Sequence, residues 1–186
     1  MTEKIETSIG MDRRRFLRIL AGTAIGLALM SPNDIVAKPT RSENLSFYHT
    51  HTGEQFDLYI DNGQWVPRHI KKLSTFLRDF RTGDIHPMDI KLFDTLHKIQ
   101  QTVGSKGVFE VISGYRSPLT NASLRSKSKG VAKKSYHMKG QAIDVRLCGL
   151  RTKDLRDIAQ DLRAGGVGYY KKSDFIHLDT GPVRFW

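Results

Sequence analysis

The chain has 186 residues and a formal net charge of +11 at pH 7, from 30 Lys and Arg against 19 Asp and Glu. Hydrophobic residues make up 39% of it, enough for a packed core and too little for a polytopic membrane protein, which indicates a globular and not a disordered chain. The single cysteine, Cys148, excludes an intrachain disulfide and a zinc site made of thiolates.

The first 37 residues have the features of an export signal. A basic segment over residues 12–18 precedes residues 19–30, which are largely apolar, uncharged and too short to span a membrane comfortably. Residues 35–37 then offer a cleavage point before Lys38. The segment resembles the twin-arginine signal, whose characteristic places are filled by Arg13, Arg14, Phe16, Leu17 and Arg18. We expect export to the periplasm by the twin-arginine export machinery, with an amphipathic anchor helix or an uncleaved signal anchor as the alternatives.

Removal of residues 1–37 leaves 149 residues, which is the size of one ordinary domain. That domain retains 25 basic and 15 acidic residues, a net charge of +10. This charge favours a polyanionic partner, and an exported protein meets the anionic polymers of the cell envelope. The sequence shows no nucleic-acid recognition motif, so we expect no nucleic-acid partner, and no stable membrane insertion once the signal is removed.

The first half of the domain is predicted to contain two strands and two helices. In chain order, the expected elements are a polar linker over residues 38–44, strands over 45–49 and 55–60, a hairpin turn at 61–63, and helices over 66–80 and 87–104. The second helix is placed from Pro87 to Gly104 because Pro suits a first helical turn and Gly a helix end.

The second half is predicted to be richer in strands. In chain order, the expected elements are a strand over residues 108–112, a polar and mobile segment over 120–135, a strand over 141–147, a helix over 152–164 with Thr152 as its cap, and strands over 167–170 and 175–179. Long helices early and strands late favour the α+β class, an antiparallel sheet with flanking helices.

Two histidines and one carboxylate stand out as a candidate ligand set for catalytic zinc: His137, Asp144 and His177. His137 precedes a glycine-containing turn and Asp144 lies on the next strand, so seven residues suffice to bring both side chains to one point. The alternative is that each is a structural or solvated residue. His49 and His51, two apart at a strand end, are a second pair of candidates, for which packing in the hairpin is the alternative.

The surrounding motif resembles a known superfamily. The pattern Ser-x-His-x-x-Gly-x-Ala-x-Asp is filled by Ser135, His137, Gly140, Ala142 and Asp144. With a later His on a strand, it resembles the zinc peptidases grouped as D-Ala-D-Ala carboxypeptidases, lysostaphin-like enzymes and Hedgehog-like domains. The closer likeness is to the YcbK-like, murein endopeptidase K-like branch, and it is carried by residues 113–117, 166–170 and 175–179. The resemblance implies a Hedgehog/D-Ala-D-Ala-peptidase-like fold and a zinc peptidase domain over residues 45–186.

The same resemblance implies a role for each candidate residue. His137, Asp144 and His177 would be the zinc ligands, and Arg116 would face the scissile carbonyl, where its guanidinium stabilises the negative charge that hydrolysis builds. Several relatives carry a Glu three residues before the last His ligand; here that position is Asp174, one methylene shorter, which makes it the candidate general base. Asp179 would instead hold a His ring by its free nitrogen.

The function that the resemblance implies is an exported zinc metallo-endopeptidase that hydrolyses peptide cross-links of peptidoglycan and binds its stem peptides. One alternative is a carboxypeptidase that releases terminal D-Ala, and another is a non-catalytic, metal-containing domain that binds the cell wall. The basic run before His137 is either a solvated loop or the rim of a cleft for an anionic substrate; its members are Lys127, Lys129, Lys133 and Lys134.

Overall fold

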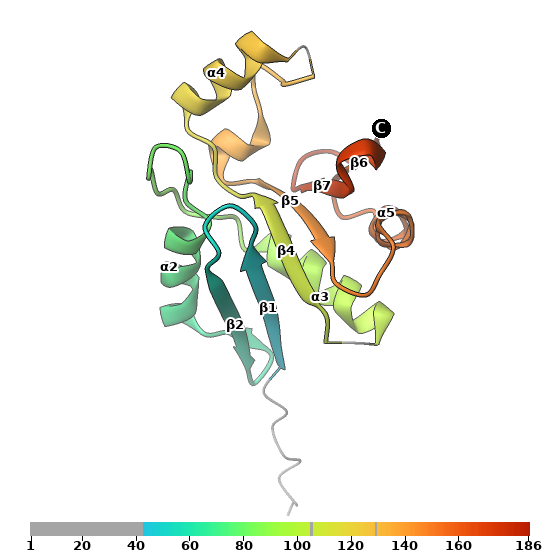
Figure 1. Cartoon of the computed structure of the whole chain (residues 1–186). Coiled ribbons are helices and arrows are strands. Elements are labelled where there is room, and N and C mark those ends of the chain that lie inside the picture. The colour runs from blue at the N-terminus through green and yellow to red at the C-terminus, as the bar shows by residue number, and fades with distance from the viewer. Residues whose placement is uncertain (1–42, 105, 129) are drawn as a thin grey trace, which may run out of the picture. The chain divides into compact units, whose positions relative to one another are not determined.

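A computed structural model describes residues 43–104, 106–128 and 130–186 (Figure 1). The predicted export signal and the predicted linker up to residue 42 therefore lie outside the described residues. All described residues fall in one compact unit of the chain. Among the helices of this described part, none has both the length and the apolar run that a membrane crossing requires.

The strands of the described residues form one mixed sheet in the order β3-β2-β1-β4-β5-β7-β6-β8. Their bounds are β1 Glu43–His49, β2 Gln55–Asp61, β3 Gln64–Trp65, β4 Val108–Ser113, β5 Ala142–Leu147, β6 Gly166–Tyr170, β7 Phe175–Asp179 and β8 Arg184–Phe185. The α+β class is confirmed. The sheet is not wholly antiparallel, however, because β1 pairs with β4 and β6 with β8 in parallel. The connection from β1 to β4 carries helices and is long enough to return the chain in the same direction.

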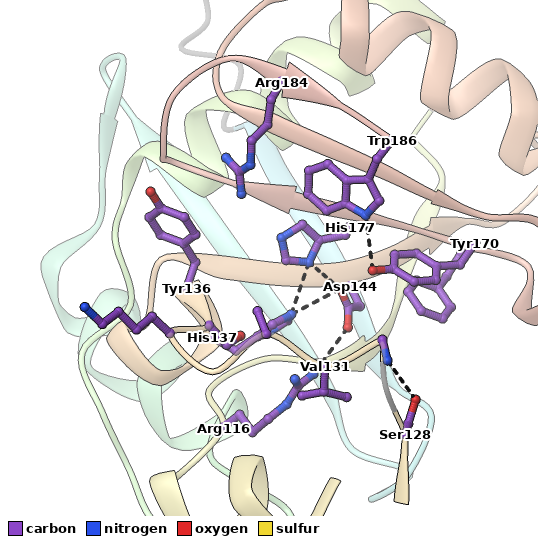
Figure 2. Close-up of a pocket in the computed structure, with 15 residues that line it drawn as sticks. Arg116, Ser128, Val131, Tyr136, His137, Asp144, Tyr170, His177, Arg184 and Trp186 are labelled. Carbon is purple, nitrogen blue, oxygen red and sulfur yellow. Dashed lines mark hydrogen bonds and ion pairs between the residues drawn. The ribbon is translucent and has the colours of Figure 1, made fainter. Parts of the chain in front are cut away.

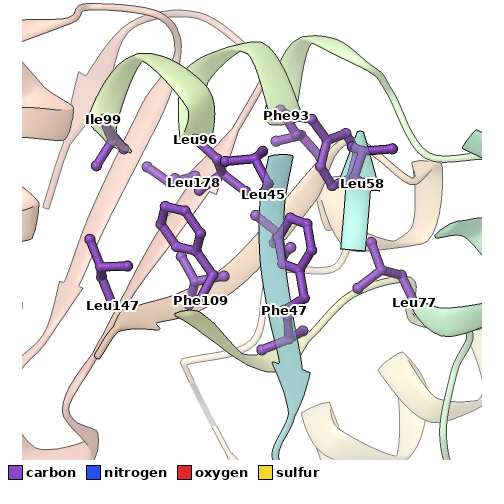
Figure 3. Packing of buried hydrophobic residues seen from close by; sticks show 14 of the residues in the cluster. Leu45, Phe47, Leu58, Leu77, Phe93, Leu96, Ile99, Phe109, Leu147 and Leu178 are labelled. Carbon is purple, nitrogen blue, oxygen red and sulfur yellow. The ribbon is translucent and has the colours of Figure 1, made fainter. Parts of the chain in front are cut away.

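Helices α2, α3 and α5 contribute, with one face of the strands, to the hydrophobic core. The helical segments are α2 Pro67–Phe76, α3 Lys91–Val103, α4 Pro118–Lys127 and α5 Thr152–Asp161, with short 3-10 helices η1 Tyr136–Lys139 and η2 Lys171–Ser173. Figure 3 shows Phe93 and Leu96 of α3 over Phe47 of β1 and Phe109 of β4. The rings of Phe47 and Phe93 meet edge to face, 6.1 Å apart.

Side chains alternate between the two faces of the sheet along β5 and β7, and this alternation places apolar and polar residues on opposite faces. Ile143 and Val145 of β5, and Ile176 and Leu178 of β7, point into the core and are buried. Because successive side chains of a strand point to opposite faces, the residues between them lie on the face that these helices leave free. This free face carries the candidate site.

Two predicted helices have different bounds from those expected. The first ends at Phe76, and Phe80 instead stacks on the ring of His51 at 4.1 Å. The second begins at Lys91 and not at Pro87, because the Asp89 N–H donates to the Gly140 carbonyl at 2.8 Å, outside any helical pattern. Its predicted end is confirmed at Gly104.

The segment predicted as mobile over residues 120–135 begins instead with helix α4 (Figure 1). The Ser117 hydroxyl accepts a hydrogen bond from the Thr120 N–H at 3.2 Å, and Pro118 occupies the first turn. These are standard signals for a helix start. The Ser-Pro cap therefore starts a helix in a segment whose polar composition is typical of a loop.

Candidate metal centre

Two of the three candidate ligands are direct partners across a pair of strands. Asp144 of β5 lies opposite His177 of β7 in the antiparallel register. Side chains of such partners stand close together on the same face of the sheet. The pairing therefore brings together two residues that are 33 positions apart in the sequence.

His137 reaches the same point from η1, through a turn that requires glycine. Gly140 ends η1 with φ of +64°, and a Cβ there would lie 2.1 Å from the Pro87 carbonyl oxygen. Only glycine combines this left-handed backbone with so close an approach. The turn folds the chain back between His137 and Asp144, as their spacing predicts.

An irregularity in β4 supplies the rest of the surroundings. The pairing of β4 with β5 shifts register between Val111 and Ser113, so that Ser113 lies opposite Asp144. The chain leaving β4 then contacts η1: the Gly114 carbonyl accepts a hydrogen bond from His137 Nδ1 at 2.7 Å, and the Arg116 N–H donates to the His137 carbonyl at 3.2 Å. These contacts fix the imidazole of His137 and place Arg116 beside it.

The three candidate side chains converge on one point (Figure 2). His137 Nε2 lies 3.2 Å from both Asp144 Oδ1 and His177 Nδ1, and His177 Nδ1 lies 2.8 Å from Asp144 Oδ1. All three residues are buried. The structure thus brings together the ligand set that the sequence singles out.

The hydrogen bonds around this cluster leave the correct atoms free for a metal ion. The Gly114 carbonyl can only accept, so His137 carries its proton on Nδ1 and keeps the Nε2 lone pair. His177 Nε2 donates to the Asp179 carboxylate at 3.0 Å, which leaves the Nδ1 lone pair. Two nitrogen lone pairs and a carboxylate oxygen then face one another, and such a set is stable only around a cation. The residues present therefore fit a zinc ion.

The shifted pKa values of Asp144 and His177 also indicate that the cluster favours a bound positive charge. Burial opposes ionisation of Asp144, but attraction to His137 and hydrogen bonds from the two imidazoles in their protonated form outweigh it and hold the pKa of Asp144 well below its usual range. Burial likewise opposes protonation of His177, yet hydrogen bonds to Asp144 and Asp179 raise its pKa to about 9. Protons and a metal ion compete for the same donor atoms.

Arg116 lies beside the cluster, and its guanidinium has hydrogen-bond donors that no described residue engages. Its Nη2 is 3.7 Å from Asp144 Oδ2, and its buried Nε has no hydrogen-bond partner in the described part of the chain. Burial lowers the pKa of the guanidinium, although Asp144 opposes that effect and an arginine stays charged in proteins. An unpaired buried N–H is costly unless a ligand completes it.

Asp179 has the contact that its position suggests, and Asp174 does not reach the cluster. Besides accepting from His177, Asp179 receives two hydrogen bonds from Arg184, at 3.0 and 2.6 Å. Asp174 lies outside the lining of the cavity, where the Thr152 hydroxyl donates to its carboxylate and Arg146 stands 3.8 Å away. Thr152 was expected to cap the start of α5, but its hydroxyl bonds to Asp174, and the N-cap residue of α5 is Arg151.

The cluster lies at the base of a cavity of about 470 Å³, a volume within the usual range for ligand sites. The sequence singles out Arg116 and the cluster, but it assigns no role to the large side chains that complete the lining: Tyr136, Tyr170, Phe175, Arg184 and Trp186. Tyr170 and Phe175 lie in residues 166–170 and 175–179, which carry the family resemblance, and that resemblance could have pointed to them. Of the basic run, Lys134 lines the cavity, while Lys129 lies outside the described residues.

The second pair of candidate ligands is a packing feature. His49 is buried, with its ring edge to face against Phe76 and Phe80, and its Nδ1 accepts a hydrogen bond from the His51 N–H. Burial, together with the nearby His51, lowers the pKa of His49 to about 4. Among the described residues, no carboxylate, thiol or imidazole joins the pair in a possible metal cluster.

The fold and this site together define a class of protein, the peptidases of metallopeptidase type. A family model described as peptidoglycan L,D-endopeptidase MepK matches residues 36–186, and the chain belongs to that family. The chain is 42% identical to peptidoglycan L,D-endopeptidase MepK of Escherichia coli strain K12 over 175 residues, which cover 93% of this chain and 96% of that protein.

A second relative has the same level of identity. It is the probable peptidoglycan L,D-endopeptidase MepK of Haemophilus influenzae, 42% identical over 183 residues, which cover 96% of this chain and 97% of that protein. No solved structure gives a significant match.

Proposed function

We propose that the chain is a zinc-dependent endopeptidase that hydrolyses peptide cross-links of peptidoglycan. The observation that carries the proposal is the convergence of His137 Nε2, Asp144 Oδ1 and His177 Nδ1 at the base of a cavity. These three atoms would hold the metal, which when bound polarises a peptide carbonyl and activates water for attack. The names of the relatives support peptidoglycan as the substrate.

The chain's own groups orient the ligands and receive the charge that develops. Gly114 and Asp179 hold the two imidazoles in the tautomers that ligation needs. Arg116 places Nη2 3.7 Å from Asp144 Oδ2, beside the cluster, so its guanidinium would stabilise the oxyanion of the scissile carbonyl. We assign no proton transfer to Asp174, because Thr152 and Arg146 hold its carboxylate elsewhere.

The charge of the cavity suits this substrate. Arg116, Lys134 and Arg184 line it, and Asp144 is the one acidic side chain among the described lining residues. Stem peptides of peptidoglycan carry free carboxylates, and a basic cleft raises the local concentration of such anions. We expect the same attraction to weaken as salt is added.

The test is digestion of purified cross-linked muropeptides by protein of known metal content. We expect dimers joined by an L,D bond to be cut into monomers by the zinc-loaded protein, the activity to disappear after chelation, and added zinc to restore it. Undiminished cleavage after complete removal of the metal contradicts the metal assignment. Release of D-Ala alone identifies a carboxypeptidase, and tight binding without turnover identifies a wall-binding domain.

We also propose that residues 1–37 direct twin-arginine export and that the domain acts in the periplasm. The support is the sequence pattern around Arg13 and Arg14 and a peptidoglycan substrate, which lies outside the cytoplasm. Changing both arginines to lysine keeps the charge and removes the guanidinium pair. We expect the precursor to stay in the cytoplasm, as measured by fractionation and immunoblotting. A normal amount of periplasmic mature protein from the double variant would point to the general secretory route.

A further inference from the structure

One side of the cavity is an aromatic wall, made of Trp186, Tyr170 and Phe175. The Trp186 ring lies 5.4 Å from the His177 ring, and its Nε1–H donates to the Tyr170 hydroxyl at 3.3 Å. Tyr170 stacks on Phe175 at 4.6 Å. Figure 2 shows Trp186 and Tyr170 on one side of the His-Asp cluster, with Arg116 across from them.

The position of Trp186 is fixed by the protein and does not depend on a ligand. Its backbone N–H donates to the Val167 carbonyl at 3.2 Å, and its main-chain oxygen accepts from the Tyr169 N–H at 2.9 Å. The indole lies directly against Gly168, where a Cβ would come 2.6 Å from the ring. Arg184, held by Asp179, lies 5.0 Å from the ring centre. A rigid, preset surface loses little entropy when it binds a ligand.

The wall presents apolar surface that no described residue covers. Trp186 is 51% exposed and Tyr170 is 37% exposed. Single exposed aromatics are ordinary, but a contiguous pair that lines a cavity beside reactive groups marks a binding surface. The cavity is therefore aromatic on one side, and carries basic groups, Arg116 and Lys134 among them, on others.

We propose that the aromatic wall binds the aliphatic side chain of the substrate residue next to the scissile bond. This proposal rests on the proposed function and names the part of the substrate that the wall recognises. A stem-peptide residue with a methylene chain that ends in ionised groups has the matching chemistry. Its methylenes are buried against the rings, and its carboxylate faces the basic groups of the cavity.

The alternative occupant, a sugar ring of the glycan strand, matches the wall less well. A pyranose needs polar partners for its hydroxyl groups once it is buried. At the wall the indole N–H already bonds to Tyr170, and two N–H groups of Arg184 already bond to Asp179, which leaves few free donors among the described residues beside the rings. An apolar chain has no such requirement.

The test compares two substrates and four zinc-loaded variants. The substrates are one cross-linked dimer with its disaccharides and the same dimer freed of all sugar. The variants are Trp186→Ala, Trp186→Phe, Gly168→Ala, which displaces the indole without removing it, and Trp65→Phe, which alters the chain's other tryptophan outside the cavity. Thermal unfolding and zinc content are measured for each, so that loss of folding is recognised.

We expect Trp186→Ala to raise KM about tenfold on both substrates, as for truncation of an aromatic anchor, with a smaller change in kcat. Gly168→Ala should do the same, and Trp186→Phe, which keeps an aromatic ring but loses the bond to Tyr170, should show a smaller rise. Trp65→Phe should stay close to wild type. A defect confined to the sugar-bearing dimer overturns the proposal in favour of glycan binding. A fall in kcat at unchanged KM also overturns it, because Trp186 would then act through His177.

Failure of the proposed function is separable from failure of this inference. If the wild-type protein cuts neither dimer, the proposed function fails, and the intact sugar-free dimer becomes a stable ligand. This dimer is then added stepwise to the Trp65→Phe variant, in which Trp186 is the remaining tryptophan, and the tryptophan fluorescence is recorded. A shift in emission supports the wall as a peptide site, and unchanged emission overturns it.

Discussion

Replacement of His137 or His177 by Ala should remove zinc and hydrolysis together. Each imidazole supplies one of three converging donor atoms, and loss of one leaves too few protein ligands for a catalytic zinc site. The metal contributes several kcal/mol of transition-state stabilisation. The fall in kcat/KM should therefore be on the order of a thousandfold or more. Metal analysis of the purified protein and digestion of cross-linked muropeptides measure the two effects.

Asp144 should behave in the same way, because its carboxylate alone among the three ligands carries a negative charge to offset that of the metal. Asp144→Ala also leaves Arg116 without its nearest acidic group, so Asp144→Asn, which preserves the shape, is the safer variant. His97→Ala is the matched control, since His97 pairs with Glu43 and lies outside the cavity. A His137→Ala protein that still holds one tightly bound zinc would remove His137 from the ligand set.

Arg116→Ala should lower kcat by about a hundredfold or more, as does loss of an oxyanion donor in other hydrolases. The guanidinium acts mainly on charge that develops in the transition state, so KM should change less. Zinc content should stay intact because Arg116 is not a ligand. Arg116→Lys should restore only part of the rate, since an ammonium group cannot reproduce the planar fork.

The matched control for Arg116 is Arg146→Ala. Arg146 lies on β5 two residues from Asp144, pairs with Glu110 and stays outside the lining of the cavity. Its loss should leave kcat near that of wild type. An unchanged kcat in Arg116→Ala, measured on cross-linked muropeptides with zinc content verified, would remove the guanidinium from the mechanism.

The parts of the fold that could be predicted are those encoded by local patterns. Alternating apolar residues such as Leu45 and Phe47 indicate β1, and the helical period that includes Leu73 indicates α2. Parallel pairing of β1 with β4 could not be predicted, because no local pattern specifies which distant strand becomes a neighbour. Helix α4 had a local signal, the cap at Ser117, in a segment whose polar composition resembles a loop.

The site divides along the same line. The cluster of His137, Asp144 and His177 could be predicted because a short motif fixes the first two and a strand carries the third. The hydrogen bond that holds Asp174 joins it to Thr152, 22 residues away, and only the packing of α5 against the sheet shows it. Trp186 lies in the cavity because its indole packs directly on Gly168, and no local sequence pattern predicts that contact.

Because Asp144 and His177 are direct partners across β5 and β7, these two strands should tolerate insertions and deletions less well than the loops do. One residue added to or removed from β5 or β7 would turn a ligand toward the core and place Val145 or Ile176 in the cavity. One such change would thus damage the packing and the chemistry at once. The loop over residues 148–151 lies outside the paired register, and apart from Leu150, which packs against the core, its residues are exposed. Length variants there should survive selection, while those within the two strands should not.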